Sequence, residues 1–254
     1  MTELPQPPRA EQRPHEYSRH GHTIQDPYHW MKDQGYPEVN DKDVLDYLKA
    51  ENAYFDAQMK PREQLVDTLF KEMKGRIKED DSSVPQKDGD WLYWYAYQVG
   101  GQYPIHYRKP VAGGPDEVLF DEPKEAEGKE YFRLGILEVS PDGKLIAWAD
   151  DTNGAERFTL KVRDLASGKD LETISAVVNG DVVWARDSKS LIYTEVNDQW
   201  RSYRALHHVL GTDPRSDKVL YEEKDELGFS VGVGDTQDEE WIIIATGDNQ
   251  TSEI

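Results

Sequence analysis

The stretch Pro141-Asp142-Gly143-Lys144-Leu145-Ile146-Ala147-Trp148 joins a polar turn to a short apolar strand. The same plan recurs at Lys87–Tyr95, Arg186–Tyr193 and Gln237–Ile244. Each copy carries an aspartate at the equivalent place, and these anchor residues are Asp88, Asp142, Asp187 and Asp238. Their spacings of 54, 45 and 51 residues indicate an internal repeat, which is typical of a modular architecture.

A repeat of this length with several short strands is typical of a β-propeller blade, whose faces are buried only against neighbouring blades. In the first three copies, two further strands are predicted after the anchor strand: Gln102–Arg108 and Val118–Phe120, Arg157–Val162 and Asp170–Thr173, and Tyr203–Val209 and Lys218–Tyr221. The fourth copy reaches Ile254 where that pair should begin. We therefore predict a mainly β fold with about three and a half propeller blades over residues 84–254, and we expect the propeller to be incomplete.

The pattern before residue 84 is helical. An Asn/Asp cap region precedes apolar residues that share one helix face, namely Val44, Leu48, Phe55 and Met59. Pro61 suits the start of a second helix, and Gly75 suits its end. The apolar stripe of this second helix consists of Leu65, Leu69 and Met73, backed by Val66 and Phe70. Two amphipathic helices are therefore predicted over about residues 41–75.

The net charge of the chain limits which classes of molecule can bind it. Fifty acidic and 30 basic side chains give a formal net charge of −20. This field repels nucleic acid and anionic lipid, so neither is an expected partner. It attracts peptides that carry Arg or Lys, although many cytoplasmic proteins are simply acidic.

The absence of cysteine excludes disulfides, thiolate zinc sites and a cysteine nucleophile. No stretch approaches the roughly 18 apolar residues of a membrane span, and residues 1–8 lack the pattern of a secretion signal. A cytoplasmic protein is expected.

Three segments resemble the N-terminal region of the prolyl oligopeptidase family of serine peptidases: Asp26–Met31, Tyr47–Tyr54 and Glu72–Asp81. Gly101–Lys109 and Glu138–Lys144 are more similar to the oligopeptidase B branch of this family than to its proline-specific branch. Together the resemblance covers the chain from about residue 12 to its end.

The resemblance implies an N-terminal segment that packs on an α/β-hydrolase domain, then a seven-bladed propeller, then the hydrolase domain with its Ser-Asp-His triad. Residues 1–83 would be the first part and residues 84–254 an incomplete second part. In the oligopeptidase B branch the family cleaves short peptides after Arg or Lys, and the propeller excludes large folded substrates. We therefore expect the N-terminal and propeller part of an oligopeptidase B-like endopeptidase, inactive without the hydrolase domain as its partner.

An alternative is a stand-alone partial propeller that acts as a protein-interaction module. The helical segment favours the peptidase, because an independent propeller has no need of its apolar stripe. The uncovered apolar faces of the helical segment and of the unfinished blade predict that the peptidase fragment self-associates, whereas a stable monomer would favour the interaction module.

One motif could suggest catalysis within the chain itself, since Gly228–Gly232 matches the G-x-S-x-G pattern of a nucleophile elbow. That elbow requires a strand, a turn and a helix around the serine. Here apolar and small residues alternate from Phe229 to Gly234, which is typical of a strand, and no helical pattern follows. All seven histidines lie at or before His208, so none follows the serine in the required order. Ser230 is predicted to be an ordinary strand residue, and no catalytic residue is expected.

The histidines do not form a metal-binding pattern. No acidic residue separates His20 from His22, and neither these two nor His29 shows the helical spacing of two ligands. The adjacent His207 and His208 point to opposite sides of a strand. We therefore expect no metal site and no cofactor.

The remaining candidates have structural interpretations. The acidic runs Glu79–Asp81 and Glu222–Glu226 coincide with predicted linkers and turns, although they could recruit basic peptides. No phosphate-binding glycine-rich loop occurs, and Gly113-Gly114 is read as a turn. Three tryptophans recur with the repeat and are expected to pack between blades: Trp148, Trp184 and Trp241.

Overall fold

The computed structural model describes residues 5–36, 38–224 and 228–254. The chain divides into two compact units, Met1–Lys78 and Glu79–Ile254. The predicted boundary after residue 83 lies close to this division. The packing of the first unit on a hydrolase domain stays a prediction.

The first unit contains a short hairpin and two helices. Its elements are β1 (Glu16–Arg19), β2 (His22–Gln25), η1 (His29–Met31), α1 (Lys42–Met59), η2 (Lys60–Arg62) and α2 (Glu63–Lys74). Asp41 caps α1, because its carboxylate accepts hydrogen bonds from the backbone N–H groups of Asp43 (2.8 Å) and Val44 (3.4 Å). Pro61 lies in η2 between the two helices, and Gly75 is the C-cap of α2. The prediction of two helices over about residues 41–75 is confirmed.

The hairpin β1–β2 was not predicted. Its tight turn is formed by His20 and Gly21, both with positive φ (51° and 78°), whereas such turns are usually marked by Asn-Gly or Asp-Gly. All eight strand residues are exposed, so the sequence lacks the alternation that reveals a half-buried strand.

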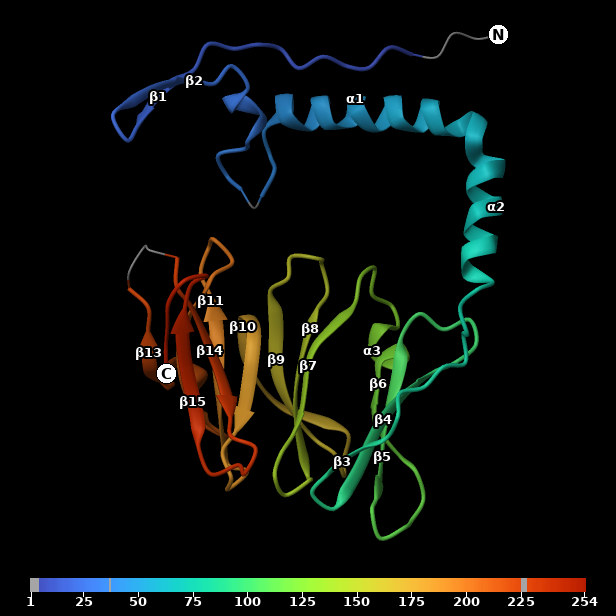
Figure 1. Cartoon of the computed structure of the whole chain (residues 1–254), viewed down its shortest axis with the longest axis vertical. Coiled ribbons are helices and arrows are strands. Elements are labelled where there is room, and N and C mark those ends of the chain that lie inside the picture. The colour runs from blue at the N-terminus through green and yellow to red at the C-terminus, as the bar shows by residue number, and fades with distance from the viewer. Residues whose placement is uncertain (1–4, 37, 225–227) are drawn as a thin grey trace. The chain divides into compact units, whose positions relative to one another are not determined.

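The second unit is built from antiparallel strands. These are β3 (Gln86–Asp88), β4 (Trp91–Tyr97), β5 (Pro104–Pro110), β6 (Glu117–Asp121), β7 (Arg133–Val139), β8 (Leu145–Asp151), β9 (Phe158–Asp164), β10 (Lys169–Trp184), β11 (Ser190–Val196), β12 (Ser202–Val209), β13 (Lys218–Glu222), β14 (Ser230–Asp235), β15 (Ile242–Gly247) and β16 (Ser252–Glu253). The short helix α3 (Glu122–Ala126) follows β6, and the short η3 (Pro214–Ser216) precedes β13. In Figure 1 the sheet that contains β4 and β5 is drawn in green at one side, β7–β10 follow in yellow-green to orange, and β11 and β13–β15 lie together in orange and red at the other side.

The strands form consecutive propeller blades. Blade 1 is the four-stranded sheet β3–β6, blades 2 and 3 form the continuous seven-stranded sheet β7–β13, and blade 4 is the three-stranded sheet β14–β16. The predicted partial propeller of about three and a half blades is confirmed. Every predicted strand pair after the anchor strands has its counterpart, from β5 and β6 in blade 1 to β12 and β13 in blade 3.

Blades 2 and 3 share one strand. The first half of β10 pairs with β9 and its second half pairs with β11, and Val178 has partners on both sides. The register shifts between Val178 and Val182. Gly180 lies in this bulge with φ of +142°, and a Cβ there would lie 2.7 Å from Oγ1 of the buried Thr194. Glycine is therefore required at the point where the strand changes blades.

Three of the anchor aspartates, Asp142, Asp187 and Asp238, lie in the turns between the innermost and the second strand of blades 2, 3 and 4, whereas Asp88 is the last residue of β3, directly before the corresponding turn of blade 1. In blades 2, 3 and 4 the aspartate Oδ1 accepts a hydrogen bond from the backbone N–H two residues later, at 3.1 Å for Asp142–Lys144, 2.9 Å for Asp187–Lys189 and 3.1 Å for Asp238–Glu240. This local hydrogen bond explains why aspartate recurs there.

Each seam between blades has its own apolar cluster. The cluster between blades 1 and 2 contains Phe120 and Trp148, whose ring centroids lie 5.0 Å apart. A second cluster joins blades 2 and 3 and contains Trp184, and a third joins blades 3 and 4. Trp148 and Trp184 are buried between blades as predicted, whereas Trp241 is 69% exposed. Trp241 lies directly before β15 of the last blade and has no following blade to cover it among the described residues.

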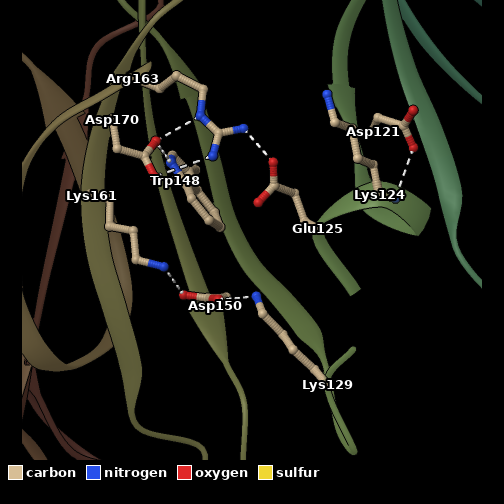
Figure 2. Close-up of polar contacts among 9 residues, drawn as sticks. All are labelled: Asp121, Lys124, Glu125, Lys129, Trp148, Asp150, Lys161, Arg163 and Asp170. Atoms are coloured by element: carbon tan, nitrogen blue, oxygen red, sulfur yellow. Dashed lines mark hydrogen bonds and ion pairs between the residues drawn. The ribbon is translucent and has the colours of Figure 1, made fainter. Parts of the chain in front are cut away.

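A polar network lies beside the first cluster (Figure 2). The Arg163 guanidinium donates to Glu125 of α3 (2.6 Å) and to Asp170 (2.6 and 3.2 Å). The indole Nε1–H of Trp148 donates to the same aspartate (3.1 Å), and Arg163 stacks over the Trp148 ring at 4.6 Å. This network fixes α3, and with it the connection from blade 1, against the sheet of blade 2.

Asp150 forms the second part of this network. Its carboxylate is 2% exposed and accepts from the ammonium groups of Lys129 (2.9 Å) and Lys161 (2.6 Å). Lys129 belongs to the segment between α3 and β7, whereas Asp150 and Lys161 belong to blade 2. Two cations around one buried carboxylate compensate the cost of removing it from water.

A buried histidine joins the outer strands of blades 2 and 3. His208 is fully buried, and its Nδ1 lies 2.7 Å from the carboxylate of Asp217. On the other side its Nε2 lies 3.3 Å from Glu172 of β10. Asp217 also accepts a hydrogen bond from the Tyr193 hydroxyl (2.9 Å), and burial together with this bond raises the pKa of Tyr193.

We expect His208→Ala to lower the free energy of unfolding by about 3–5 kcal/mol, because the buried carboxylate of Asp217, which is 1% exposed, would lose its imidazole partner. Urea unfolding followed by circular dichroism measures this loss.

His207→Ala is the matched control. His207 is only half-buried and lies on the opposite face of β12. Its replacement should cost about 1 kcal/mol or less. Equal losses in the two variants would show that the imidazole of His208 has no special role.

Candidate functional site

The innermost strands of the four blades surround a cavity of about 840 Å³. It is lined by residues of β3, β7, β14 and the second half of β10, and by the turns that follow these strands. We call this lining the inner wall. Its volume lies within the range of small-ligand and peptide-side-chain sites, about 300–1,000 Å³.

The inner wall is strongly acidic. Its lining contains eight carboxylate side chains, from Asp88, Asp90, Glu138, Asp142, Asp181, Asp235, Glu239 and Glu240, and one basic side chain, Arg186. The excess of acid over base is far greater than in the chain as a whole, where 50 acidic side chains face 30 basic ones. The negative charge is therefore concentrated at this cavity.

Each blade contributes one carboxylate from its innermost strand: Asp88 from β3, Glu138 from β7, Asp181 from β10 and Asp235 from β14. All four side chains are exposed to the cavity. None of them makes a hydrogen bond or ion pair with another residue in the described part of the chain. Four unpaired carboxylates around one cavity create a negative potential that attracts cations and repels anions.

Glu138 shows the effect of this crowding. Its surroundings in the cavity displace solvent, and the carboxylates of Asp235, Asp181 and Asp88 repel its charge. Together these causes raise the pKa of Glu138 to about 7. A cation that enters the cavity therefore favours the loss of a proton from Glu138.

Ser230 is placed where the sequence analysis put it. It is the first residue of β14 and pairs with Gly247 of β15. The elements that follow it are strands rather than a helix, so the described residues do not form a nucleophile elbow around it. The absence of catalytic residues stays a prediction.

The histidines are dispersed. His20 lies in the β1–β2 turn, His22 begins β2, and His29 stacks on His15 with ring centroids 3.7 Å apart. His207 and His208 lie on opposite faces of β12, as predicted. Within the described ranges, no group of three His, Asp or Glu side chains is arranged to hold a metal ion.

The acidic runs lie where linkers and turns were expected. Glu79–Asp81 precedes blade 1, where Glu79 accepts a hydrogen bond from the backbone of Gly100. Of the run Glu222–Glu226, residues 225 and 226 lie outside the described residues. Gly113 and Gly114 both have positive φ and form the turn between β5 and β6.

The sequence analysis did not identify the inner wall. Of its four strand carboxylates only Asp88 is an anchor residue, and the others precede their anchors by different distances, since Glu138 precedes Asp142 and Asp181 precedes Asp187. Without a constant spacing, the repeat gave no sign that these residues converge. Side chains alternate between the two faces of a strand, and this alternation within β7 and β14 was the sequence signal that could have placed their carboxylates at the cavity.

The radial blades and the acidic inner wall define a β-propeller domain that can hold a cationic ligand.

The comparisons with known proteins agree with this class. The family described as "Prolyl oligopeptidase, N-terminal beta-propeller domain" matches residues 5–254, so the chain belongs to that family.

Three relatives illustrate the similarity. Dipeptidyl aminopeptidase BI of Pseudoxanthomonas mexicana is 35% identical over 98% of this chain and 36% of its own length. Protease 2 of Moraxella lacunata is 28% identical over 97% of this chain and 36% of its own length. The structure of oligopeptidase B from Leishmania major has a TM-score of 0.87 at 28% identity and covers 97% of this chain and 37% of that one.

The chain thus spans little more than a third of the length of the relatives it matches. It is the N-terminal propeller domain of prolyl oligopeptidase family peptidases, which include oligopeptidase B. No helix among the described residues is long and apolar enough to cross a membrane.

We expect Glu138→Gln to stabilise the fold at pH 8 and to leave it unchanged at pH 4. The folded state holds the Glu138 proton up to a pKa of about 7, whereas the group's ordinary value is 4.5. The free energy of unfolding therefore falls as the pH rises from about 4.5 to about 7, and this loss disappears with glutamine. Because the side chain is open to solvent, the gain is about 1 kcal/mol, or about 2–4 °C in melting temperature.

Thermal unfolding between pH 4 and pH 8 measures this effect. Glu240→Gln, which removes a charge from the rim of the same cavity, should give a smaller gain at pH 8. A Glu138→Gln profile parallel to that of the unmodified chain would contradict the assignment.

Proposed function

We propose that the chain is the propeller part of an oligopeptidase B-like serine endopeptidase that cleaves short peptides after Arg or Lys. The observation that carries this proposal is the family match over residues 5–254 together with 28–35% identity to relatives named as peptidases. The matched residues form the propeller blades and the N-terminal helical segment. The chemistry would then be supplied by the hydrolase domain that accompanies the propeller in this family.

The acidic inner wall supports the preference for basic peptides. Its unpaired carboxylates attract Arg and Lys side chains at long range, and salt weakens this attraction. The volume of the cavity supports the filtering of substrates by size, since about 840 Å³ can hold part of an extended peptide and not a folded domain. We also place the protein in the cytoplasm, which the lack of cysteine supports.

The stand-alone interaction module is the less supported alternative. The helical segment that argues against it is present, with α1 and α2 both formed. The family match includes this segment as well as the blades.

A chimaera tests the peptidase proposal. The chain would replace the matched part of the Moraxella relative, so that its blades accompany a known catalytic remainder. We expect the chimaera to hydrolyse short Arg- and Lys-containing peptides and the 254-residue chain alone to hydrolyse none, because Ser230 begins a strand and no histidine follows it to act as its base. Fluorogenic peptides assayed at low and high salt measure both outcomes.

Ser230→Ala is the control in both proteins and should change neither rate. Turnover by the chain alone that disappears in Ser230→Ala would refute the proposal. Turnover that survives this change would indicate a contaminating peptidase, and a well-folded chimaera inactive on basic peptides would count against the assigned specificity.

We further propose that the chain self-associates through the apolar stripe of α2. Four large side chains of this stripe are 46–60% exposed: Leu65, Leu69, Phe70 and Met73. Burying this stripe against a second copy is favourable by roughly 25 cal/mol per Å² of apolar surface.

Sedimentation velocity should therefore show species larger than the 29.2 kDa monomer. The double variant Leu69→Gln/Phe70→Gln should shift the chain to monomer, because glutamine keeps the helix propensity and removes the apolar surface. A wild-type chain that stays monomeric at all concentrations would contradict this proposal.

A further inference from the structure

A second, smaller cavity opens at the inner edge of blade 1. Its volume is about 350 Å³, and it lies between β4 and β5 of blade 1 and β7 of blade 2. The residues that face one another across it include Tyr93, Tyr95 and His106 on one side and Leu137 and Glu138 on the other. We call this cavity the blade 1 slot.

A bulge in the innermost strand accounts for the slot. Ser82 bridges to Ala96, and Gln86 pairs with Tyr93. Between these two pairs the inner strand advances by four residues, whereas β4 advances by three. The extra residue lies at Val84-Pro85, where the proline cannot donate a backbone hydrogen bond, and Val84 is 80% exposed. The backbone register along the inner edge of β4 therefore shifts between Tyr93, which pairs with Gln86, and Tyr95, whose backbone is hydrogen-bonded to the backbone N–H and the hydroxyl of Ser83.

The slot combines aromatic rings with unpaired negative charge. Asp88 and Glu138 both line it, and neither carboxylate is paired with another described residue. Tyr95 is 42% exposed, and burial raises the pKa of Tyr93, which keeps the Tyr93 phenol neutral at physiological pH. No lysine or arginine occurs among the residues that line the slot, and its one histidine, His106, is already bound to Glu122 at 2.7 Å.

This arrangement matches the chemistry of a guanidinium group. A planar cation stacks on aromatic faces and forms charge-assisted hydrogen bonds with carboxylates. Elsewhere in the same unit an arginine already adopts such a position, since Arg163 stacks on Trp148 and pairs with Asp170. The blade 1 slot offers the same partners without an occupant from the described part of the chain.

We propose that the blade 1 slot binds one arginine side chain of a peptide that lies along the inner wall. This inference rests on the proposed function, because it takes basic peptides to be what enters the cavity. It adds that the propeller holds one side chain at a defined place, in addition to attracting peptides through its general field.

The test is a calorimetric or NMR titration of the 254-residue chain at pH 8 with N-acetyl-arginine amide. The neutral isostere N-acetyl-citrulline amide is the ligand control. We expect the arginine probe to bind at least about tenfold more tightly than the citrulline probe, because only the first carries a charge for Asp88 and Glu138. Glu138→Gln and Asp88→Asn should each weaken the arginine probe by about tenfold.

Asp235→Asn is the matched control variant. Asp235 lies on the same inner wall and outside the slot lining, and its charge raises the pKa of Glu138. Its loss should leave binding of the arginine probe unchanged or slightly tighter, whereas a purely long-range attraction would weaken with each of the three variants.

The pH supplies an independent measure. With a Glu138 pKa of about 7, the ionised fraction of this carboxylate rises about tenfold between pH 6 and pH 8. Binding should strengthen over this interval in the unmodified chain and in Asp235→Asn, and much less in Glu138→Gln. Asp88→Asn keeps the test decisive if Glu138→Gln fails to fold, as judged by circular dichroism.

Three results would each overturn the slot: equal binding of the two probes, equal weakening by all three variants, or no binding of the arginine probe at millimolar concentration. None of these measurements involves peptide cleavage. The slot can therefore fail while the peptidase proposal stands, and an inactive chimaera leaves the slot intact.

Discussion

A propeller blade can bury its two faces only against its neighbours, and the rest of this structure follows from that constraint. Each seam carries its own apolar cluster, and no single core unites the unit. The turns at the inner ends are also linked across each seam, by Arg108 to Gly143 (2.7 Å), Asp142 to Ser188 (3.0 Å) and Arg186 to Asp238 (3.2 Å). Trp148 and Trp184 are buried at seams, whereas Trp241, directly before β15 of blade 4, is 69% exposed.

The same constraint separates stability from function in this fold. The seams contain compensated charges, such as Asp150 between two lysines, and these strengthen the stack. The innermost strands border open space instead, so their carboxylates have no structural partner. Glu138, with its pKa near 7, costs the fold stability above that pH. A ligand role for this group is what the blade 1 slot proposes.

The repeat made the blades predictable, because three of the four anchor aspartates form a local hydrogen bond such as that from the N–H of Lys144 to Asp142 Oδ1. The helices were predictable for a similar reason, since Asp41 and Pro61 act within one or two turns. What escaped prediction depends on distant residues. Glu138 and Asp235 are nearly a hundred positions apart in the printed sequence, and only the closing of the blades around one axis brings them together.

Strand β10 affects how the blades of the propeller unfold locally. Sixteen residues run without interruption from the outer edge of blade 2 to the inner edge of blade 3, and Val178 is hydrogen-bonded within both sheets. Blade 1, by contrast, is joined to blade 2 through α3 and a loop. Opening one of the two middle blades must break hydrogen bonds in the other, so their amides should exchange with solvent as a single cooperative group. The two middle blades are therefore expected to open as one cooperative block.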